Sequence, residues 1–298
     1  MGKFVWKFML ILVIICAFAV VIPSSISLAE EGVIPLEQNE MPQLDESCFI
    51  SDTEYKDASL HITLEKNRLN GTNYVVARIK IAHPSQLRSA LVSPDGKRAL
   101  HGSTLAKKIN VPFAINGDQF AKHLSYVGKH IVRQGKVFRS NASGVFDAMI
   151  IDDKGDITLI PHATNADIDA FEGEIVNSFA FGPALIIDGE LQTEFTAKNI
   201  SVDRSAQRMA FAQTGELSYM CIVSEGPECM GSKGFTLPEF ATLIHSFGEV
   251  ENAYNLDGGS SATLVFHNKK FNSPQNPKIR SITDLICFAS AVEAGVEE

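Results

Sequence analysis

Short apolar runs separated by polar turns recur along most of the chain after residue 57. In the second half of the segment 74–82, apolar and polar residues alternate, which is the pattern of a strand with one buried face. Four pairs ending in glycine lie between apolar runs, as in β-hairpins: Asp95-Gly96, Gln134-Gly135, Asp188-Gly189 and Thr214-Gly215. The pattern therefore predicts many strands.

Helical signals are fewer. The clearest covers 236–247, where Thr236 and Glu239 have capping-box spacing and Gly248 can end the helix in a left-handed conformation. A second helix is predicted over 103–109. No segment repeats at a fixed period, which argues against a solenoid or propeller. The sequence therefore predicts one α+β domain over 58–298, with a strand-rich mixed sheet core and a few short flanking helices.

The N-terminus differs from the rest of the chain. Lys3 and Lys7 precede an apolar run over 8–22, and small residues at 27–29 follow, so residues 1–29 are predicted to be a signal peptide or an uncleaved signal anchor. Residues 30–57 are acidic and contain prolines, which predicts a linker. The domain is then expected outside the cell or on its surface, with membrane contact only through the N-terminal segment.

The charge balance narrows the partners. The full chain has a formal net charge of -9, and removal of residues 1–29, which contain two lysines and no acid, takes it to -11. No basic cluster is present, which argues against nucleic acid as a partner.

Four cysteines lie outside the N-terminal segment: Cys48, Cys221, Cys229 and Cys287. Outside the cell, Cys221 and Cys229 can close a short disulfide loop, and buried or free thiols are the equal alternative. No spacing of cysteine and histidine matches a zinc site.

Two polar turns carry the candidate chemistry. Asn116-Gly117-Asp118 follows one apolar strand, and the stretch from Asn255 through Asp257 to Gly259 follows another. Each strand comes after a predicted helix. Glycine allows a ligand to approach the backbone, and a carboxylate can accept hydroxyl hydrogen bonds or act on a bound substrate. The two turns are therefore predicted to share one pocket. A serine nucleophile is not indicated, since no Gly-x-Ser-x-Gly motif is present.

Four blocks of sequence resemble the phosphodiester glycosidase family. They are Ala-Ile-Asn-Gly-Asp-Gln-Phe at 114–120, Phe-Gly-Pro-Ala-Leu-Ile-Ile-Asp-Gly-Glu-Leu at 181–191, Arg-Met-Ala-Phe-Ala-Gln-Thr at 208–214 and Asn-Leu-Asp-Gly-Gly-Ser-Ser-Ala-Thr-Leu-Val at 255–265. The family includes the lysosomal enzyme that removes N-acetylglucosamine to uncover mannose 6-phosphate. The resemblance extends over about 58–288, in the family's order.

The resemblance implies an exported glycosidase that cleaves the bond between a sugar's anomeric carbon and a phosphodiester oxygen, as in N-acetylglucosamine-1-phosphodiesters. The implied catalytic residues are Asp257, as nucleophile or base, and Asp118 as its partner, with retention and inversion both open. Arginine forks bind leaving phosphates well. The implied substrate-binding residues are Asn116, Gly117, Arg208, Asn255, Gly258, Gly259, Ser260, Arg280 and Asp284.

Some features depart from the family. Ser260 stands where a third glycine is usual, and Arg204 competes with Arg208 for the family's arginine position. No cofactor is certain, although a divalent cation such as calcium is compatible with the paired carboxylates of Asp118 and Asp257. The expected partner is a carbohydrate phosphodiester or a cell-envelope glycopolymer. The alternative function is a non-catalytic sugar-binding or envelope-polysaccharide scaffold, which is disfavoured because the only tryptophan, Trp6, lies in the export segment.

Overall fold

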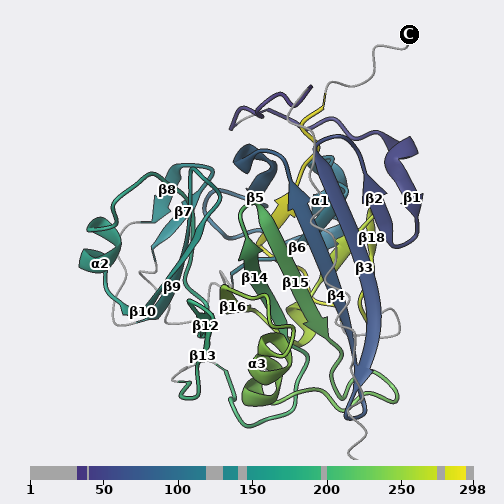
Figure 1. The fold of residues 1–298 in the computed structure, drawn as a ribbon, viewed down its shortest axis with the longest axis vertical. Helices are drawn as coiled ribbons and strands as arrows, with labels where there is room; N and C mark the ends of the chain where they lie inside the picture. Colours follow the sequence, from purple (N-terminus) through teal and green to yellow (C-terminus); the bar gives the residue numbers. More distant parts are fainter. Residues whose placement is uncertain are drawn as a thin grey trace, which may run out of the picture.

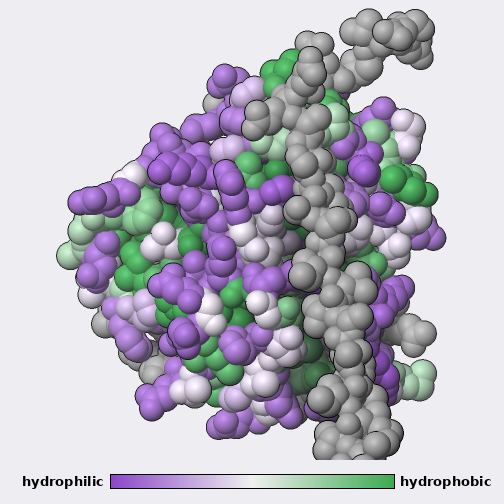
Figure 2. All heavy atoms as spheres, viewed as in Figure 1, coloured by the Kyte–Doolittle hydropathy of each residue, from purple (hydrophilic) through white to green (hydrophobic). Residues whose placement is uncertain are grey.

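The structure, a computed structural model, describes residues 32–38, 40–118, 130–139, 146–195, 200–273 and 279–292. The predicted signal segment lies outside these ranges. Among the helices in these ranges, none is long and apolar enough to cross a bilayer. Hydrophilic residues lie over much of the face shown in Figure 2, with hydrophobic residues interspersed among them.

The largest element is a nine-stranded antiparallel sheet that runs across the molecule (Figure 1). Its strands are, in sheet order, β1 (Phe49–Ser51), β2 (Glu54–Lys56), β3 (Leu60–Leu69), β4 (Thr72–Ile81), β15 (Ser218–Ser224), β14 (Met209–Gly215), β16 (Asn252–Leu256), β12 (Ala184–Ile187) and β13 (Glu190–Leu191). The long β3–β4 hairpin and the β14–β15 hairpin form its centre, so neighbours along the chain are also neighbours in the sheet.

A five-stranded sheet packs against the inner face of the first. It contains β18 (Lys269–Lys270), β17 (Leu264–Phe266), β6 (Phe113–Asn116), β19 (Asp284–Phe288) and β5 (Leu87–Leu91), in that order. A third sheet forms the lobe at the left of Figure 1, with the order β10 (Ile157–Ala163), β9 (Phe146–Asp152), β11 (Ile175–Phe179), β7 (Ile131–Arg133) and β8 (Lys136–Arg139).

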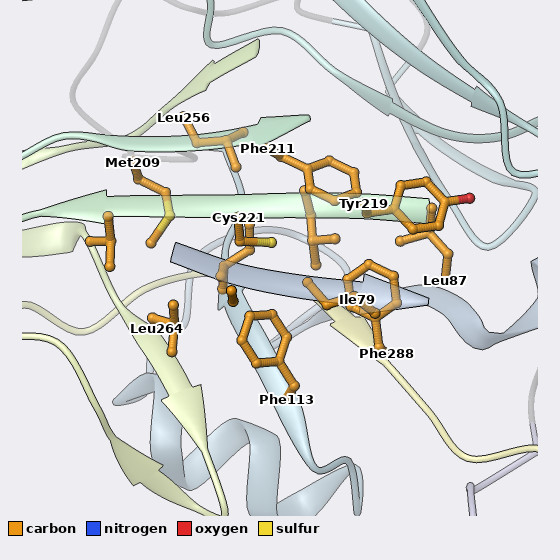
Figure 3. Packing of buried hydrophobic residues seen from close by; sticks show 14 of the residues in the cluster. Ile79, Leu87, Phe113, Met209, Phe211, Tyr219, Cys221, Leu256, Leu264 and Phe288 are labelled. Atoms are coloured by element: carbon orange, nitrogen blue, oxygen red, sulfur yellow. The ribbon is translucent and has the colours of Figure 1, made fainter. Parts of the chain in front are cut away.

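The main core lies between the nine-stranded sheet and the five-stranded sheet that contains β6. On β14, Met209 and Phe211 point into this core, whereas Ala210 and Ala212 point to the opposite face, as the two-residue period of a strand requires. Figure 3 shows Phe211 near Tyr219 on β15 and these side chains above residues of the second sheet. The ring of Phe211 stacks on Tyr219 at 5.6 Å between centroids. The two sheets are thus held together by large buried side chains.

Helices cover the outer faces. Helix α3 (Leu237–His245) packs on the outer face of the nine-stranded sheet, and α1 (Gly102–Lys108) packs on the outer face of the five-stranded sheet. Helix α2 (Asn165–Asp169) packs on the lobe. Three short 3-10 helices complete the described elements: Glu46–Cys48, Pro84–Gln86 and Gly259–Ser261.

Both predicted helices are confirmed. Helix α3 has the predicted capping box: the Thr236 backbone N–H donates to the Glu239 carboxylate at 2.8 Å, and the Glu239 N–H donates to the Thr236 hydroxyl at 3.3 Å. Gly248, with φ of 75°, follows the helix as expected.

Two of the four predicted hairpin turns are confirmed, since 134–135 joins β7 to β8 and 188–189 joins β12 to β13. Residues 214–215 are still paired within β14, so the turn falls two residues later. Residues 95–96 form a turn that leads towards α1 rather than into a hairpin partner. Pairs ending in glycine thus marked places where the chain turns, but they did not always show which strands the turn joins.

The strand-rich prediction is confirmed, and the label α+β applies only loosely to a mostly β structure. The predicted mixed sheet is wrong, since all strand pairs among the described residues are antiparallel. The strands that follow the two predicted helices, β6 and β16, lie in different sheets and pair only with antiparallel neighbours.

The segment predicted as a linker over 30–57 contributes to the domain. It contains β1 and β2, which pair with β3. Before them, Nη2 of Arg88 donates to the backbone carbonyl oxygens of Glu37, Gln38 and Glu40 at 3.0, 2.9 and 3.2 Å. The acidic composition therefore indicates a surface position here, not a free tether.

The four cysteines in the described residues are free thiols, so the predicted alternative of a disulfide between Cys221 and Cys229 is wrong. Cys221 lies on β15 with its side chain in the main core, and Cys229 is buried in the loop after β15. Burial raises the pKa of the Cys221 thiol well above its usual range, which disfavours the reactive thiolate.

Candidate active site

The ends of β6 and β16 meet, although they come from different sheets. The Nδ2 group of Asn116, the last residue of β6, donates to the backbone carbonyl oxygen of Asp257 at 2.8 Å. Its Oδ1 accepts the N–H of Thr263 at 2.9 Å. The two turns therefore lie in contact, whereas a pocket shared by both stays a prediction. Asn116 is 1% exposed, so its amide braces the two turns and does not reach a sugar hydroxyl.

Asp257 lines a cavity of about 250 Å³. The polar side chains and glycines that line it with Asp257 include Arg204, Arg208, Glu228, Asn255, Gly258 and Gly259. Asp257 is partly exposed. Burial raises its pKa to about 6, the charge of Asp118 adds to the rise, and the Ser261 hydroxyl and the charge of Arg280 oppose it. A carboxyl group that titrates near neutral pH beside a cavity is typical of a catalytic site.

The two glycines after Asp257 are needed for different reasons, Gly258 for close backbone packing and Gly259 for a left-handed conformation. A Cβ atom on Gly258 would lie 2.6 Å from the carbonyl oxygen of Gln207. Gly259, with φ of 58°, donates its N–H to the same oxygen at 2.8 Å. The backbone of Gly258 lowers the pKa of the Asp257 carboxyl group. The predicted use of the Gly259 N–H for substrate is wrong, because that group has a partner within the protein, whereas the use of the Gly258 N–H stays a prediction.

Asp118 belongs to a buried charge cluster next to the cavity. Its carboxylate accepts the N–H of Ala180 at 3.2 Å on Oδ1 and 3.0 Å on Oδ2, and Nη2 of Arg133 lies 3.4 Å from Oδ2. Arg133 also donates to Oδ2 of Asp284 from Nη2 at 2.6 Å and from Nε at 3.2 Å. Asp118 is 7% exposed and Asp284 is 0% exposed. Asp284 was predicted to bind substrate, but its carboxyl group is buried and pairs with Arg133.

Gly117 lies against the same cluster. A Cβ atom there would lie 2.5 Å from Oδ2 of Asp284, and the Gly117 N–H donates to the backbone oxygen of Asp284 at 3.2 Å. Its role is thus the close approach of β6 to β19. Asn255 likewise is 1% exposed and donates from Nδ2 to the carbonyl oxygen of Gly182 at 2.8 Å, although it borders the cavity.

The three arginines near the cavity differ in whether their guanidinium groups are free to bind a ligand. Arg208 is 3% exposed, and its guanidinium donates to the carbonyl oxygens of Phe235, Ser201 and Arg204 at 3.1, 2.8 and 2.7 Å. Burial lowers its pKa to about 10. The guanidinium of Arg208 therefore has a structural role, because it is hydrogen-bonded to the surrounding backbone. Arg204, in contrast, is exposed and borders the cavity. Within the described residues, the Arg204 side chain forms no ion pair.

Arg280 and Ser260 lie at the same end of the site. Nη1 of Arg280 donates to the Ser261 hydroxyl at 3.4 Å, and the Arg280 N–H donates to the carbonyl oxygen of Ser260 at 3.1 Å. Both residues retain exposed surface. The structure thus brings the predicted Arg280 close to Asp257, in a position to meet an anionic ligand.

Sequence reasoning missed Arg133 and Glu228, and it ranked Arg204 below Arg208. Arg133 lies in a short apolar strand, and a charged residue in such a run is a signal for a buried ion pair. Glu228 has no local signal, because it reaches the cavity through the fold of the loop after β15.

A divalent cation does not fit the pair Asp118 and Asp257. Arg133 already places its positive charge on Asp118, and the Ala180 N–H contacts both oxygens of that carboxylate. In the described part of the chain, no group of three or more histidine, cysteine, aspartate or glutamate side chains is arranged to hold a metal ion.

The sequence comparison agrees with this geometry. A sequence model of the phosphodiester glycosidase family matches residues 110–289, which is more than half of the 298 residues. The chain belongs to the phosphodiester glycosidase family. The match includes both polar turns, Arg133 and Asp284. No curated protein matches the sequence.

Solved structures show the same fold. The catalytic domain of zebrafish N-acetylglucosamine-1-phosphodiester alpha-N-acetylglucosaminidase, auto-inhibited by its pro-peptide, aligns with a TM-score of 0.62 and 20% identity, covering 84% of this chain and 87% of that one. A hypothetical protein from Synechocystis aligns with a TM-score of 0.54 and 14% identity, covering 80% of this chain and 64% of that one. At these identities the likeness shows a shared fold.

Proposed function

We propose that this protein hydrolyses the bond between the anomeric carbon of a sugar and a phosphodiester oxygen, as in N-acetylglucosamine-1-phosphodiesters. The observation that carries the proposal is the position of Asp257, which borders the cavity together with the exposed cation Arg204. Membership of the phosphodiester glycosidase family supports the reaction class.

Asp257 has the properties that the reaction requires. With a pKa of about 6, its carboxyl group is mostly ionised at neutral pH, so it can attack the oxocarbenium-like carbon or activate a water molecule. The departing phosphodiester is a stable anion and needs charge stabilisation more than a proton. Arg204, which borders the same cavity, and Arg280, whose charge acts on Asp257, can supply this positive charge.

Asp118 acts on the reaction through electrostatics. Its carboxylate is nearly buried and has partners on both oxygens, so we assign it no contact with substrate. Its charge raises the pKa of Asp257 and thereby strengthens Asp257 as a base.

The partner and the location follow the sequence. We propose that the domain is exported through its N-terminal segment and acts on a carbohydrate phosphodiester or cell-envelope glycopolymer. The formal net charge of -9 agrees with a protein that binds single phosphate groups locally through Arg204 and Arg280, instead of a polyanion along a basic surface.

Turnover of matched substrates tests the function. The purified domain is incubated with an N-acetylglucosamine-1-phosphodiester, the corresponding phosphomonoester and an uncharged aryl glycoside, and the released sugar is measured. The proposal expects release from the phosphodiester at the highest kcat/KM. Tight sugar binding without release from any substrate would instead support the non-catalytic scaffold.

Replacement of Asp118 by asparagine is expected to move the acid limb of the rate profile to lower pH. The rate falls as Asp257 takes up a proton, and removal of the neighbouring negative charge lowers the pKa of Asp257 from about 6. The measurement is kcat/KM from pH 4 to pH 8 for wild type and Asp118→Asn. An acid limb that stays in place or moves to higher pH contradicts the assignment.

Substitution of Arg204 is expected to affect catalysis, whereas substitution of Arg208 is expected to affect stability. Arg204→Ala should lower kcat/KM on the phosphodiester by about tenfold, the effect of one lost charge contact of roughly 1.4 kcal/mol, and should leave the melting temperature unchanged. Arg208→Met should lower the melting temperature, because it leaves three carbonyl oxygens without their donor. Kinetics and thermal melts of both variants check this, and a stable Arg208→Met that has lost only phosphate affinity contradicts it.

A further inference from the structure

Arg133, Asp118 and Asp284 form a buried cluster with one positive and two acidic groups. Their exposed fractions are 3%, 7% and 0%. The three residues come from β7, the turn after β6, and β19. The ring of Phe179 covers the guanidinium of Arg133 at 3.9 Å from its centroid. The cluster therefore lies in a setting of low polarity, where an unmatched charge is costly.

The carboxyl groups of Asp118 and Asp284 differ in how many of their oxygens accept a hydrogen bond. Asp118 has a donor on each oxygen. In Asp284, Oδ2 is contacted by Nη2 and Nε of Arg133 and by the N–H of Asp118 at 3.3 Å, whereas Oδ1 is buried and has no hydrogen-bond partner among the described residues. An ionised carboxylate shares its charge between both oxygens, so an ionised Asp284 would place charge on an atom that nothing stabilises.

We propose that Asp284 is held as a neutral acid protonated on Oδ1, and that Arg133 and Asp284 are positioning residues that fix the charged Asp118 beside Asp257. The single charge of Arg133 is then matched by the single charge of Asp118, and the cluster is neutral overall. The catalytic consequence rests on the proposed function, but the charge state does not.

The surrounding groups agree with this assignment. Burial raises the pKa of Asp284 to about 7, the charge of Asp118 raises it further, and Arg133 opposes the rise. Arg133 on β7 and Asp118 after β6 are the charged groups that act on Asp284. Tyr254 on β16 faces Asp118 and Arg133, and burial raises the pKa of its hydroxyl well above the usual range, so it stays neutral.

Thermal melts of Asp284→Asn test the charge state without an activity assay. The pKa of Asp284 is higher in the folded than in the unfolded chain, so its contribution to stability is fully present below about pH 4 and is lost as the pH rises through about 7. Asparagine is neutral at every pH and keeps an acceptor for Arg133. The melting temperature of the variant relative to wild type is therefore expected to be higher at pH 8 than at pH 5.

The opposite pH trend, in which the variant loses more at pH 8, would overturn the proposal, because it would show that the ionised form stabilises the fold. A titration of Asp284 in the wild-type protein tests the same charge state even if the Asp284→Asn variant folds poorly. The carboxyl carbon of Asp284, followed by NMR, is expected to titrate near neutral pH. Titration near pH 4 would also overturn the neutral acid.

Kinetics of Arg133→Lys and Asp284→Asn test the positioning role. Lysine keeps the charge but cannot fork between two carboxyl groups, so kcat is expected to fall by about tenfold or more while KM stays within about twofold. Asp284→Asn keeps an acceptor for Arg133 and Asp284→Ala removes it, so kcat is expected to fall more in Asp284→Ala than in Asp284→Asn. Unchanged kcat in Arg133→Lys would overturn the positioning role. A wild type without turnover would refute the proposed function instead, and the melts would still report on Asp284.

Discussion

Replacement of Asp257 by asparagine is expected to lower kcat on a sugar-1-phosphodiester by about 10³-fold or more, on the order of the loss seen when one catalytic carboxylate is removed. Asparagine has nearly the same shape as aspartate, so it can still accept the Ser261 and Gly258 hydrogen bonds. It cannot attack a carbon centre or take a proton from water. KM is expected to change little, because the substitution leaves in place Arg204 and Arg280, the proposed phosphate ligands.

The same substitution at an aspartate far from the proposed site serves as the control for Asp257→Asn. Asp153 is exposed in the turn between β9 and β10, and Asp153→Asn should keep full activity. Circular dichroism and thermal melts of both variants should match those of wild type. If Asp257→Asn turns over substrate within about threefold of wild type, Asp257 is not the catalytic carboxylate, whatever the activity of the protein.

Replacement of Phe211 by alanine is expected to lower the free energy of unfolding by about 3–5 kcal/mol, the usual cost of emptying a buried phenylalanine site. Phe211 is 0% exposed at the centre of β14, and its ring contacts Tyr219 and Phe288 at 5.6 and 6.1 Å between centroids. Phe288 belongs to the opposing sheet, so the cavity would open between the two sheets (Figure 3). The melting temperature should fall by roughly 10 °C.

Val137→Ala provides the control for this prediction. Val137 lies on β8 and is 55% exposed, so its truncation should change the free energy of unfolding by less than about 0.5 kcal/mol. Urea unfolding curves of both variants give the comparison. A Phe211→Ala protein as stable as wild type would mean that the two sheets are not held together at this position.

Local features of the sequence predicted the fold to a large extent. The capping box at Thr236 and Glu239, with Gly248 after it, located α3, and alternation over 74–82 located most of β4. These signals act over a few residues. The direction of strand pairing does not, and for that reason the predicted mixed sheet was wrong, since a helix before a strand does not fix the sheet that the strand joins.

The sequence predicted where the candidate site lies better than it predicted what each of its residues does. Both polar turns converge as expected, because glycine and carboxylates at the ends of buried strands mark places where backbone and ligand approach closely. Several predicted ligands instead have partners inside the protein: the amide of Asn116, the N–H group of Gly259 and the guanidinium of Arg208. A side chain's type shows which bonds it can form, but its neighbours decide which bonds it forms.

The sequence by itself determined the positions of β4, α1 and α3, the resemblance to the phosphodiester glycosidase family, and the two turns that carry Asp118 and Asp257. Only the tertiary structure decided that Arg204 is exposed beside the cavity while Arg208 is not, and that Arg133 joins Asp118 to Asp284. The physical reason is distance along the chain. Hydrogen bonds within a turn depend on adjacent residues, whereas burial and the pairing of charges 151 residues apart depend on how the sheets pack.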